Sequence, residues 1–160
     1  MALDLIAELE RVIDALDAAG VEYALCGGLA LAVHGHPRAT KDIDILLRPE
    51  ALDEGLAAAR TVGFDIPARK MTFGLKTGHV REVQRVSKLD PETGQLLVLD
   101  FLLVNAELES AWSGRIAVRS GERHLTVVSR DGLATMKRIA GRKQDQADLA
   151  KLEGTDDEER

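Results

Sequence analysis

The chain has 160 residues, of which 45% are hydrophobic and 30% charged, and this composition excludes a wholly disordered protein. The net charge of −6 excludes a broad basic surface for nucleic acid, and no apolar run reaches the roughly 18 residues of a membrane span. The single cysteine, Cys26, permits neither an intramolecular disulfide nor a thiolate zinc site, and the N-terminus lacks the pattern of a secretory signal. We therefore expect one cytoplasmic domain without a membrane segment.

Apolar spacing and turn residues predict both helices and strands along the chain. Helices are expected at residues 2–19, 29–34, 50–61 and 130–140, with a helical turn at 106–112 and a last helix that ends near residue 152. Strands are expected at residues 21–26, 42–47, 71–75, 81–86, 95–104, 116–119 and 125–128. Residues 153–160 are mostly charged and are expected to form a flexible tail.

Two aspartates are separated by one isoleucine in the strand expected at residues 42–47. Because side chains alternate along a strand, Asp42 and Asp44 share one face, Ile43 occupies the other, and the two aspartate Cα atoms lie roughly 6–7 Å apart. Both carboxylates can converge on one cation, or on two cations about 4 Å apart. The alternative is an exposed strand edge with two solvated acids.

Asp100 is the one charged residue in the run QLLVLDFLLV at residues 95–104, which predicts a buried central strand. A lone carboxylate among leucines is costly unless it is paired, protonated or bound to metal. If this strand lies beside residues 42–47, three carboxylates meet, and such hard oxygen ligands suit Mg²⁺ or Mn²⁺. The alternative is a buried salt bridge with Arg38 or Lys137.

Gly27 and Gly28 stand between an expected strand and an expected helix. The absence of side chains allows a phosphate to approach the backbone, and the free N–H groups of the following helix would point at it. A Gly-Gly pair is more often only a turn, and this one belongs to neither a Walker loop nor a dinucleotide-binding fingerprint.

These three features, in this order, resemble the nucleotidyltransferase signature of the DNA polymerase β-like superfamily. That signature joins an apolar residue and Gly-Gly or Gly-Ser, through a short spacer, to acid–apolar–acid–apolar. Here LCGG at residues 25–28 is followed by DIDI at residues 42–45, and Asp100 matches the third acid on a later strand. The segment GGLALAVHGHPRATKDIDILL also resembles the minimal nucleotidyltransferases of toxin–antitoxin and abortive-infection systems, the AbiEii-like group.

The resemblance implies an α/β (α+β) nucleotidyltransferase domain at residues 1–152, with a core at about 20–104 and C-terminal helices at about 130–152. Its sheet would be mixed and curved, with the helices packed on one side. Asp42, Asp44 and Asp100 would be catalytic and bind Mg²⁺ or Mn²⁺, while Gly27 and Gly28 would hold the phosphates of a nucleoside triphosphate such as ATP. The reaction would move a nucleoside monophosphate to a hydroxyl, with pyrophosphate as the leaving group.

Other polar residues are further candidates for nucleotide binding. Arg38, Thr40 and Lys41 precede the acid pair and can contact phosphate, although Arg38 can equally neutralise the carboxylates without a ligand. Lys137 can face the site and hold a triphosphate, but the basic cluster from Lys137 to Lys143 can also be a solvated helix face.

Five more residues carry weaker signals. Asp145 and Asp148 match a late acid of the family only approximately and can instead pair with Arg142 or Lys151. His34 and His36 have no third partner for a metal, and Cys26 is expected to be a small buried hydrophobe.

The resemblance leaves the acceptor open among tRNA, proteins and small molecules, and it favours the toxin of a toxin–antitoxin pair with a cognate partner protein. One alternative is a noncatalytic nucleotidyltransferase-fold module that binds a nucleotide or a partner, as an antitoxin would. Another is an aminoglycoside-type resistance enzyme, which predicts an open acidic cleft beside the carboxylates.

Overall fold

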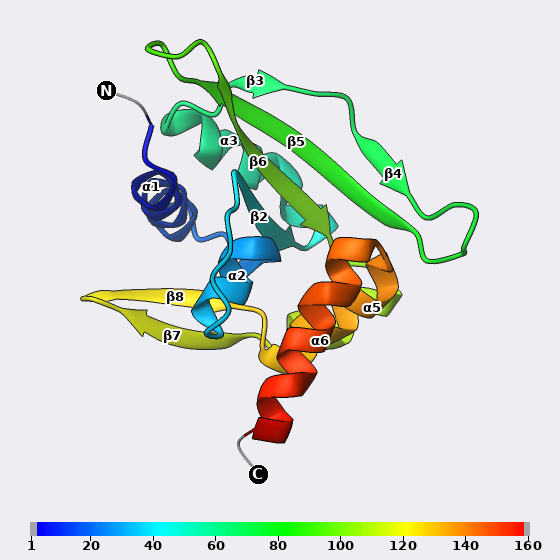
Figure 1. The fold of residues 1–160 in the computed structure, drawn as a ribbon. Helices are drawn as coiled ribbons and strands as arrows, with labels where there is room; N and C mark the ends of the chain where they lie inside the picture. The colour runs from blue at the N-terminus through cyan, green and yellow to red at the C-terminus, as the bar shows by residue number, and fades with distance from the viewer. Residues whose placement is uncertain (1–2, 159–160) are drawn as a thin grey trace.

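The computed structural model describes residues 3–158, with side chains for residues 3–154. One mixed sheet, in the order β3-β5-β6-β2-β1-β8-β7 with β4 paired to β5, forms its centre (Figure 1). β2 runs parallel to β6 and β1 runs parallel to β8, whereas the other neighbours are antiparallel. The strands are β1 (Ala24–Cys26), β2 (Asp42–Leu47), β3 (Ile66–Pro67), β4 (Met71–Phe73), β5 (Arg81–Leu89), β6 (Leu96–Leu103), β7 (Ile116–Ser120) and β8 (Arg123–Val127).

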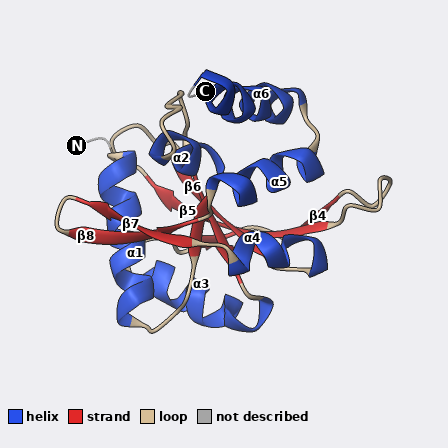
Figure 2. Cartoon of the chain, turned by 90° about the horizontal axis from the view of Figure 1, so that it is seen from below, coloured by secondary structure: helices blue, strands red, loops and turns tan. Residues whose placement is uncertain are grey.

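Helices cover both faces of this sheet, so the expectation that they pack on one side was wrong. Figure 2 shows α1 and α3 on one face and α2, α5 and α6 on the other. No helix in the described residues is long and apolar enough to cross a membrane. The helices are α1 (Leu5–Ala18), α2 (Gly27–Val33), α3 (Leu52–Thr61), α4 (Glu109–Ser113), α5 (Arg130–Ala140) and α6 (Lys143–Glu158), with 3₁₀ turns η1 (Pro49–Ala51) and η2 (Ala106–Leu108).

The alternation of side chains along β2 and β6 explains why there are two helical layers. Ile43 and Phe101 are fully buried on the face toward α3. Helix α3 packs closely on this face, since a Cβ on Gly55 would lie only 2.7 Å from Leu47 Cδ1. The opposite face of β2 carries its aspartates in a half-buried position. The same two strands therefore supply a hydrophobic core on one side and polar groups on the other.

Helix α5 is fixed at both ends by local hydrogen bonding. The Ser129 hydroxyl accepts a hydrogen bond from the Gly132 N–H at 3.0 Å, which confirms the expected cap. The helix ends at Gly141, whose φ of 66° is left-handed. This turn reverses the chain into α6 and places the side chains of both helices over the polar face of the sheet.

Two elements differ from the expectations. β3, only two residues long, is not predicted because so short an edge strand leaves no periodic signal. The last helix also extends beyond its expected end near residue 152, since α6 continues to Glu158. Leu152 is buried, and its carbonyl oxygen accepts a hydrogen bond from Arg130. Glu153 forms an ion pair with Arg138 on α5. These contacts anchor the helical turn at residues 152–153, and the helix extends past it. Residues 159–160 of the expected tail lie outside the described residues.

Candidate active site

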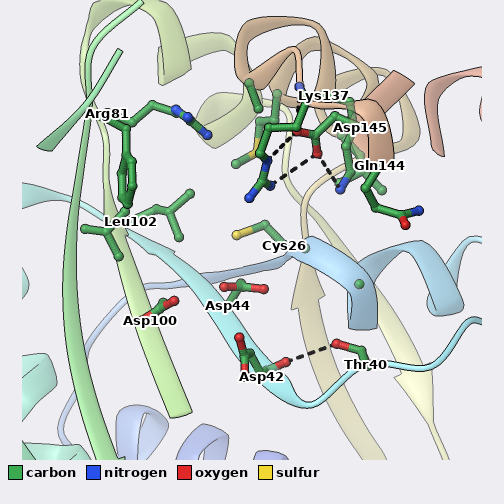
Figure 3. Close-up of a pocket in the computed structure, with 18 of the residues that line it drawn as sticks. Cys26, Thr40, Asp42, Asp44, Arg81, Asp100, Leu102, Lys137, Gln144 and Asp145 are labelled. Carbon is green, nitrogen blue, oxygen red and sulfur yellow. Dashed lines mark hydrogen bonds and ion pairs between the residues drawn. The ribbon is translucent and has the colours of Figure 1, made fainter. Parts of the chain in front are cut away.

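A cleft of about 620 Å³ opens on the polar face of the sheet. It is bounded by the β1–α2 junction, residues 38–41, β2, β5, β6, α5 and the start of α6 (Figure 3). The structure brings every predicted catalytic and nucleotide-binding residue into its lining, namely Gly27, Gly28, Arg38, Thr40, Asp42, Asp44, Asp100 and Lys137.

The three candidate metal ligands come from two adjacent strands. β2 and β6 are parallel, with Asp44 directly opposite Asp100, and Asp42 lies two residues earlier on the same face. Figure 3 shows the three carboxylates grouped at the base of the cleft. The expectation that the strand of residues 95–104 lies beside residues 42–47 is therefore confirmed.

Burial and the neighbouring acids make the negative charge of Asp44 unfavourable in the free protein. Burial, followed by the charges of Asp100 and Asp42, raises the pKa of Asp44 to about 7. Burial also raises the pKa of Asp42, and Asp100 adds to that rise. The neighbouring thiol of Cys26 is fully buried, as expected, and burial with the charge of Asp44 raises its pKa. A cation placed among these carboxylates would relieve the repulsion.

The free energy of unfolding of the metal-free protein is expected to fall between about pH 4 and about pH 7 because of Asp44. The pKa of Asp44 is about 7 in the folded state and about 3.9 in the unfolded state. The folded state therefore binds this proton more tightly, and its stability falls as the pH rises from the lower value to the higher one. We expect a loss of about 2 kcal/mol, measured by chemical denaturation. Asp44→Asn is expected to flatten the profile, and an equally steep decline in that variant would contradict this origin.

Asp100 has an ion-pair partner that differs from the two expected ones. Arg85, directly opposite it on β5, donates from Nε to Oδ1 at 2.8 Å and from Nη2 to Oδ2 at 3.0 Å. Arg38 and Lys137, the expected partners, bind other carboxylates. The bidentate geometry occupies both oxygens of Asp100 in the free protein.

The Gly27-Gly28 turn is packed too closely for side chains. Gly27 has a φ of +68°, and a Cβ there would overlap the Asp44 carboxylate. A Cβ on Gly28 would lie 3.0 Å from Thr40 Oγ1, and that hydroxyl donates to the Asp42 carbonyl oxygen at 3.5 Å (Figure 3). The absent side chains thus allow the turn, residues 38–41 and the acid pair to meet in one place.

Gly27→Ala is expected to lower the free energy of unfolding by about 2 kcal/mol, because it adds both backbone strain and a clash with Asp44. Gly20→Ala is the matched control, since Gly20 has a φ of +71° and nothing within 4 Å of the new Cβ. Chemical denaturation of both variants separates the two contributions. Equal losses in the two variants would show that close approach to Asp44 contributes nothing.

A buried ionic network closes the side of the cleft nearest α6. Lys137 Nζ lies 3.3 Å from Asp145 Oδ1 and 3.1 Å from Asp148 Oδ2, and all three residues are buried. Arg142 Nε donates to Asp145 at 2.7 Å, which confirms that pairing, whereas Asp148 is bound by Lys137 and by Arg38 at 3.2 Å rather than by Lys151. The network holds α6 on α5 and keeps three cationic side chains, Arg38, Lys137 and Arg142, at the cleft wall.

The donor set of the cleft fits a divalent cation, although the free protein has not assembled the site. Asp42 and Asp44 place carboxylate oxygens on one face, and burial followed by mutual repulsion raises their pKa values. Carboxylate oxygens are the ligands that Mg²⁺ prefers. Yet no group of three or more His, Cys, Asp or Glu side chains in the described residues is arranged to hold an ion. One of the three carboxylates, Asp100, is instead bound by the Arg85 guanidinium.

Comparison with known families decides among the functions that such a cleft allows. The profile of the aminoglycoside-2''-adenylyltransferase family matches residues 8–88, a stretch that includes Gly27, Gly28, Asp42 and Asp44. The chain belongs to this family. It is therefore a nucleotidyltransferase and an enzyme of the transferase class. No curated protein matches the sequence.

Solved structures with low sequence identity share the fold of this nucleotidyltransferase. A Thermotoga maritima protein described as a nucleotidyltransferase superposes with a TM-score of 0.61 at 15% identity, over 94% of this chain and 92% of its own. ANT(2'')-Ia, solved in complex with adenylyl-2''-tobramycin, gives 0.62 at 12% identity over 94% and 88%. JHP933 from Helicobacter pylori gives 0.57 at 15% identity over 92% and 63%. The closer resemblance to the AbiEii-like group stays a prediction.

In this nucleotidyltransferase, Arg85→Gln is expected to tighten Mn²⁺ binding about tenfold in the absence of nucleotide, because both oxygens of Asp100 become available. Electron paramagnetic resonance of free Mn²⁺ measures the affinity. The matched control is Arg48→Gln, which removes another bidentate pair, with Glu109 at 3.0 and 2.6 Å, outside the cleft lining. Unchanged affinity in Arg85→Gln would contradict competition between Arg85 and the ion.

Sequence reasoning missed the arginines that β5 contributes. Arg81 and Arg85 occupy alternate positions on the strand and both line the cleft, together with Val83 between them. The signal that could have found them is this period-two spacing, which places them on one face of a strand next to the strand of Asp100. An arginine in a strand is equally compatible with a solvent-exposed sheet edge, so the spacing alone does not show that Arg81 and Arg85 face a site.

The weaker histidine candidates do not line the cleft. His34 Nε2 lies 2.8 Å from the Val128 carbonyl oxygen, and His36 Nε2 lies 3.3 Å from Arg130 Nη2. Of the basic cluster, Lys137 and Arg142 line the cleft, whereas Arg138 forms an exposed pair with Glu153. Lys137 therefore faces the cleft, as expected, whereas Arg138 lies on a solvated helix face.

Proposed function

We propose that this nucleotidyltransferase moves a nucleoside monophosphate from a nucleoside triphosphate, with ATP as the first candidate, to a hydroxyl of an acceptor in a Mg²⁺-dependent reaction. The observation that carries the proposal is the placement of Asp42, Asp44 and Asp100 on adjacent parallel strands beside the Gly27-Gly28 turn. Membership in an adenylyltransferase family supports the same reaction class.

Asp42, Asp44 and Asp100 would hold Mg²⁺ or Mn²⁺. Such an ion, when bound, offsets the negative charge of the phosphates and of the attacking oxygen. The carboxylates contribute by lining the base of the cleft, where burial and then their mutual repulsion raise the pKa values of Asp42 and Asp44.

The phosphates of the donor would lie along the opposite wall. The bare backbone of Gly27 and Gly28 allows them to approach, and the Thr40 hydroxyl lies beside the same turn. Arg38 and Lys137 line this part of the cleft and supply positive charge, although both are held by carboxylates of α6 in the free protein. Pairing keeps their side chains in place for a ligand.

In the transfer step, the acceptor oxygen forms a bond to the α-phosphorus as the bond to the pyrophosphate oxygen breaks. The hydroxyl proton passes to Asp100, and pyrophosphate leaves with the electron pair of the broken bond. Arg85 fixes the orientation of the Asp100 carboxylate, which still has lone pairs to accept that proton.

Incubation with each nucleoside triphosphate labelled at the α-phosphate, Mg²⁺, and separate RNA, protein and small-molecule fractions of a cell extract tests the proposal. We expect one fraction to take up label with release of an equal amount of pyrophosphate. Asp53 is an exposed aspartate on α3, and Asp53→Asn is the control for Asp44→Asn in this assay. Failure of every fraction to take up label, when Mg²⁺-dependent nucleotide binding is present, would contradict the transfer reaction.

The biological setting is a second, separate proposal. We propose that the enzyme acts as the toxin of a toxin–antitoxin pair with a cognate partner protein. The support is the resemblance of residues 27–47 to that group.

A further inference from the structure

The β4–β5 hairpin supplies one wall of the cleft. Met71 lies directly opposite Val83 and Phe73 directly opposite Arg81, and all four residues line the cleft. In the sheet order, β5 lies on the far side of β6 from β1, whose end carries the Gly27-Gly28 turn. Figure 3 likewise shows Arg81 on the side of Asp100, away from Thr40. This hairpin wall therefore lies on the side of the three carboxylates that is away from the Gly27-Gly28 turn.

Arg81 is the unpaired guanidinium of the cleft. Arg38, Arg85 and Arg142 each bind a carboxylate, whereas Arg81 forms no ion pair with any described residue. Its Nε is buried without a hydrogen-bond partner, and its guanidinium lies 5.5 Å from the centre of the Phe73 ring. Burial, followed by the charge of Arg142, lowers the pKa of Arg81. A guanidinium in this position gains most from a bidentate anion such as a phosphate.

The carboxylates that line the cleft leave no partner for a cationic acceptor. They are Asp42, Asp44, Asp100 and Asp145. The first three belong to the proposed metal site, and Asp145 is buried against Lys137 and Arg142. An amine-rich acceptor would meet Arg81 instead of a free acid, so the acidic cleft expected for an aminoglycoside-type enzyme is not found in the described lining.

We propose that the hairpin wall, through Arg81, binds a phosphate group carried by the hydroxyl acceptor. The acceptor is thus a phosphorylated hydroxyl compound, either a small phosphate ester or an RNA end, and not a polycation. This inference rests on the proposed nucleotidyl transfer and names its acceptor class. It separates this chain from ANT(2'')-Ia, whose structure holds adenylated tobramycin.

Isothermal titration of the enzyme saturated with Mg²⁺ and a non-hydrolysable ATP analogue tests this class. The probes are ribose 5-phosphate, ribose, a short RNA with a 3′ hydroxyl, and tobramycin. We expect ribose 5-phosphate or the RNA to bind at least about tenfold more tightly than ribose and tobramycin. The preference between those two probes identifies the source of the phosphate.

Arg81→Gln is expected to weaken the binding of the favoured phosphate probe about tenfold. Arg81→Lys keeps the positive charge but loses the two-pronged guanidinium, so it is expected to weaken the binding by less. The affinity for the ATP analogue is expected to stay the same in both. Arg138→Gln, an exposed arginine outside the cleft, is the matched control.

Tighter binding of tobramycin than of either phosphate probe, or equal phosphate affinity in wild type and Arg81→Gln, would overturn the inference while leaving the proposed function intact. Absence of Mg²⁺-dependent binding of the analogues of all four nucleoside triphosphates would instead overturn the proposed function, and this inference with it. Binding of the analogues is therefore measured first.

Discussion

Asp44→Asn is expected to reduce nucleotidyl transfer by about a thousandfold or more while the protein stays folded. Asp44 lies between Asp42 on its own strand and Asp100 on the next, so its loss removes the central carboxylate of the proposed metal site. Its amide also removes a charge that the fold disfavours, because burial and two neighbouring acids raise the pKa of Asp44 to about 7. Activity and stability should therefore change in opposite directions at pH 8.

Release of pyrophosphate measures the activity, and chemical denaturation at pH 8 measures the stability. Asp53→Asn provides the matched change at an exposed position on α3, on the other face of the sheet, and is expected to retain full activity. A variant Asp44→Asn that keeps more than about a tenth of the activity would contradict a central role for this carboxylate.

Lys137→Met is expected to lower the free energy of unfolding by about 3 kcal/mol. The ammonium lies within 3.3 Å of Asp145 and 3.1 Å of Asp148, and its removal leaves two buried carboxylates with less positive charge around them. Arg142 and Arg38 keep part of the pairing, which places the loss at the lower end of the range for a broken buried ion pair. Chemical denaturation at neutral pH measures the change.

Lys143→Met makes the same substitution at an exposed position on the next helix, and its effect is expected to stay within about 0.5 kcal/mol. A loss below about 1 kcal/mol in Lys137→Met would show that Lys137 is not required to hold α6 on α5.

The acidic part of the site could be predicted because its pattern is local and its chemistry has few alternatives. DIDI places Asp42 and Asp44 on one face by the geometry of a strand, and the core face of β2 is buried as that alternation requires. Asp100 is conspicuous because a charge in an apolar strand needs a partner. The resemblance then supplied what spacing does not, namely that these two strands are neighbours, and the register Asp44–Asp100 confirms it.

The partners of these acids could not be predicted, because they depend on the register of other elements. Asp100 pairs with Arg85 only because β5 aligns those two residues across the sheet. Asp148 pairs with Arg38 across 110 positions of sequence, where helical spacing suggested Lys151. Long flexible cations can reach several acids, so sequence distance says little about which pair forms. The choice is made by packing, which a single sequence does not reveal.

We propose that Asp42, Asp44 and Asp100 hold divalent metal beside a nucleotide. The most direct test of this proposal is a crystal structure of the enzyme grown with Mn²⁺ and a non-hydrolysable ATP analogue, with anomalous scattering used to locate the metal. We predict an anomalous peak within ligand distance of Asp42 and Asp44, with the triphosphate against Gly27 and Gly28. A bound nucleotide with Mn²⁺ elsewhere, or with no ion at these carboxylates, would contradict the account.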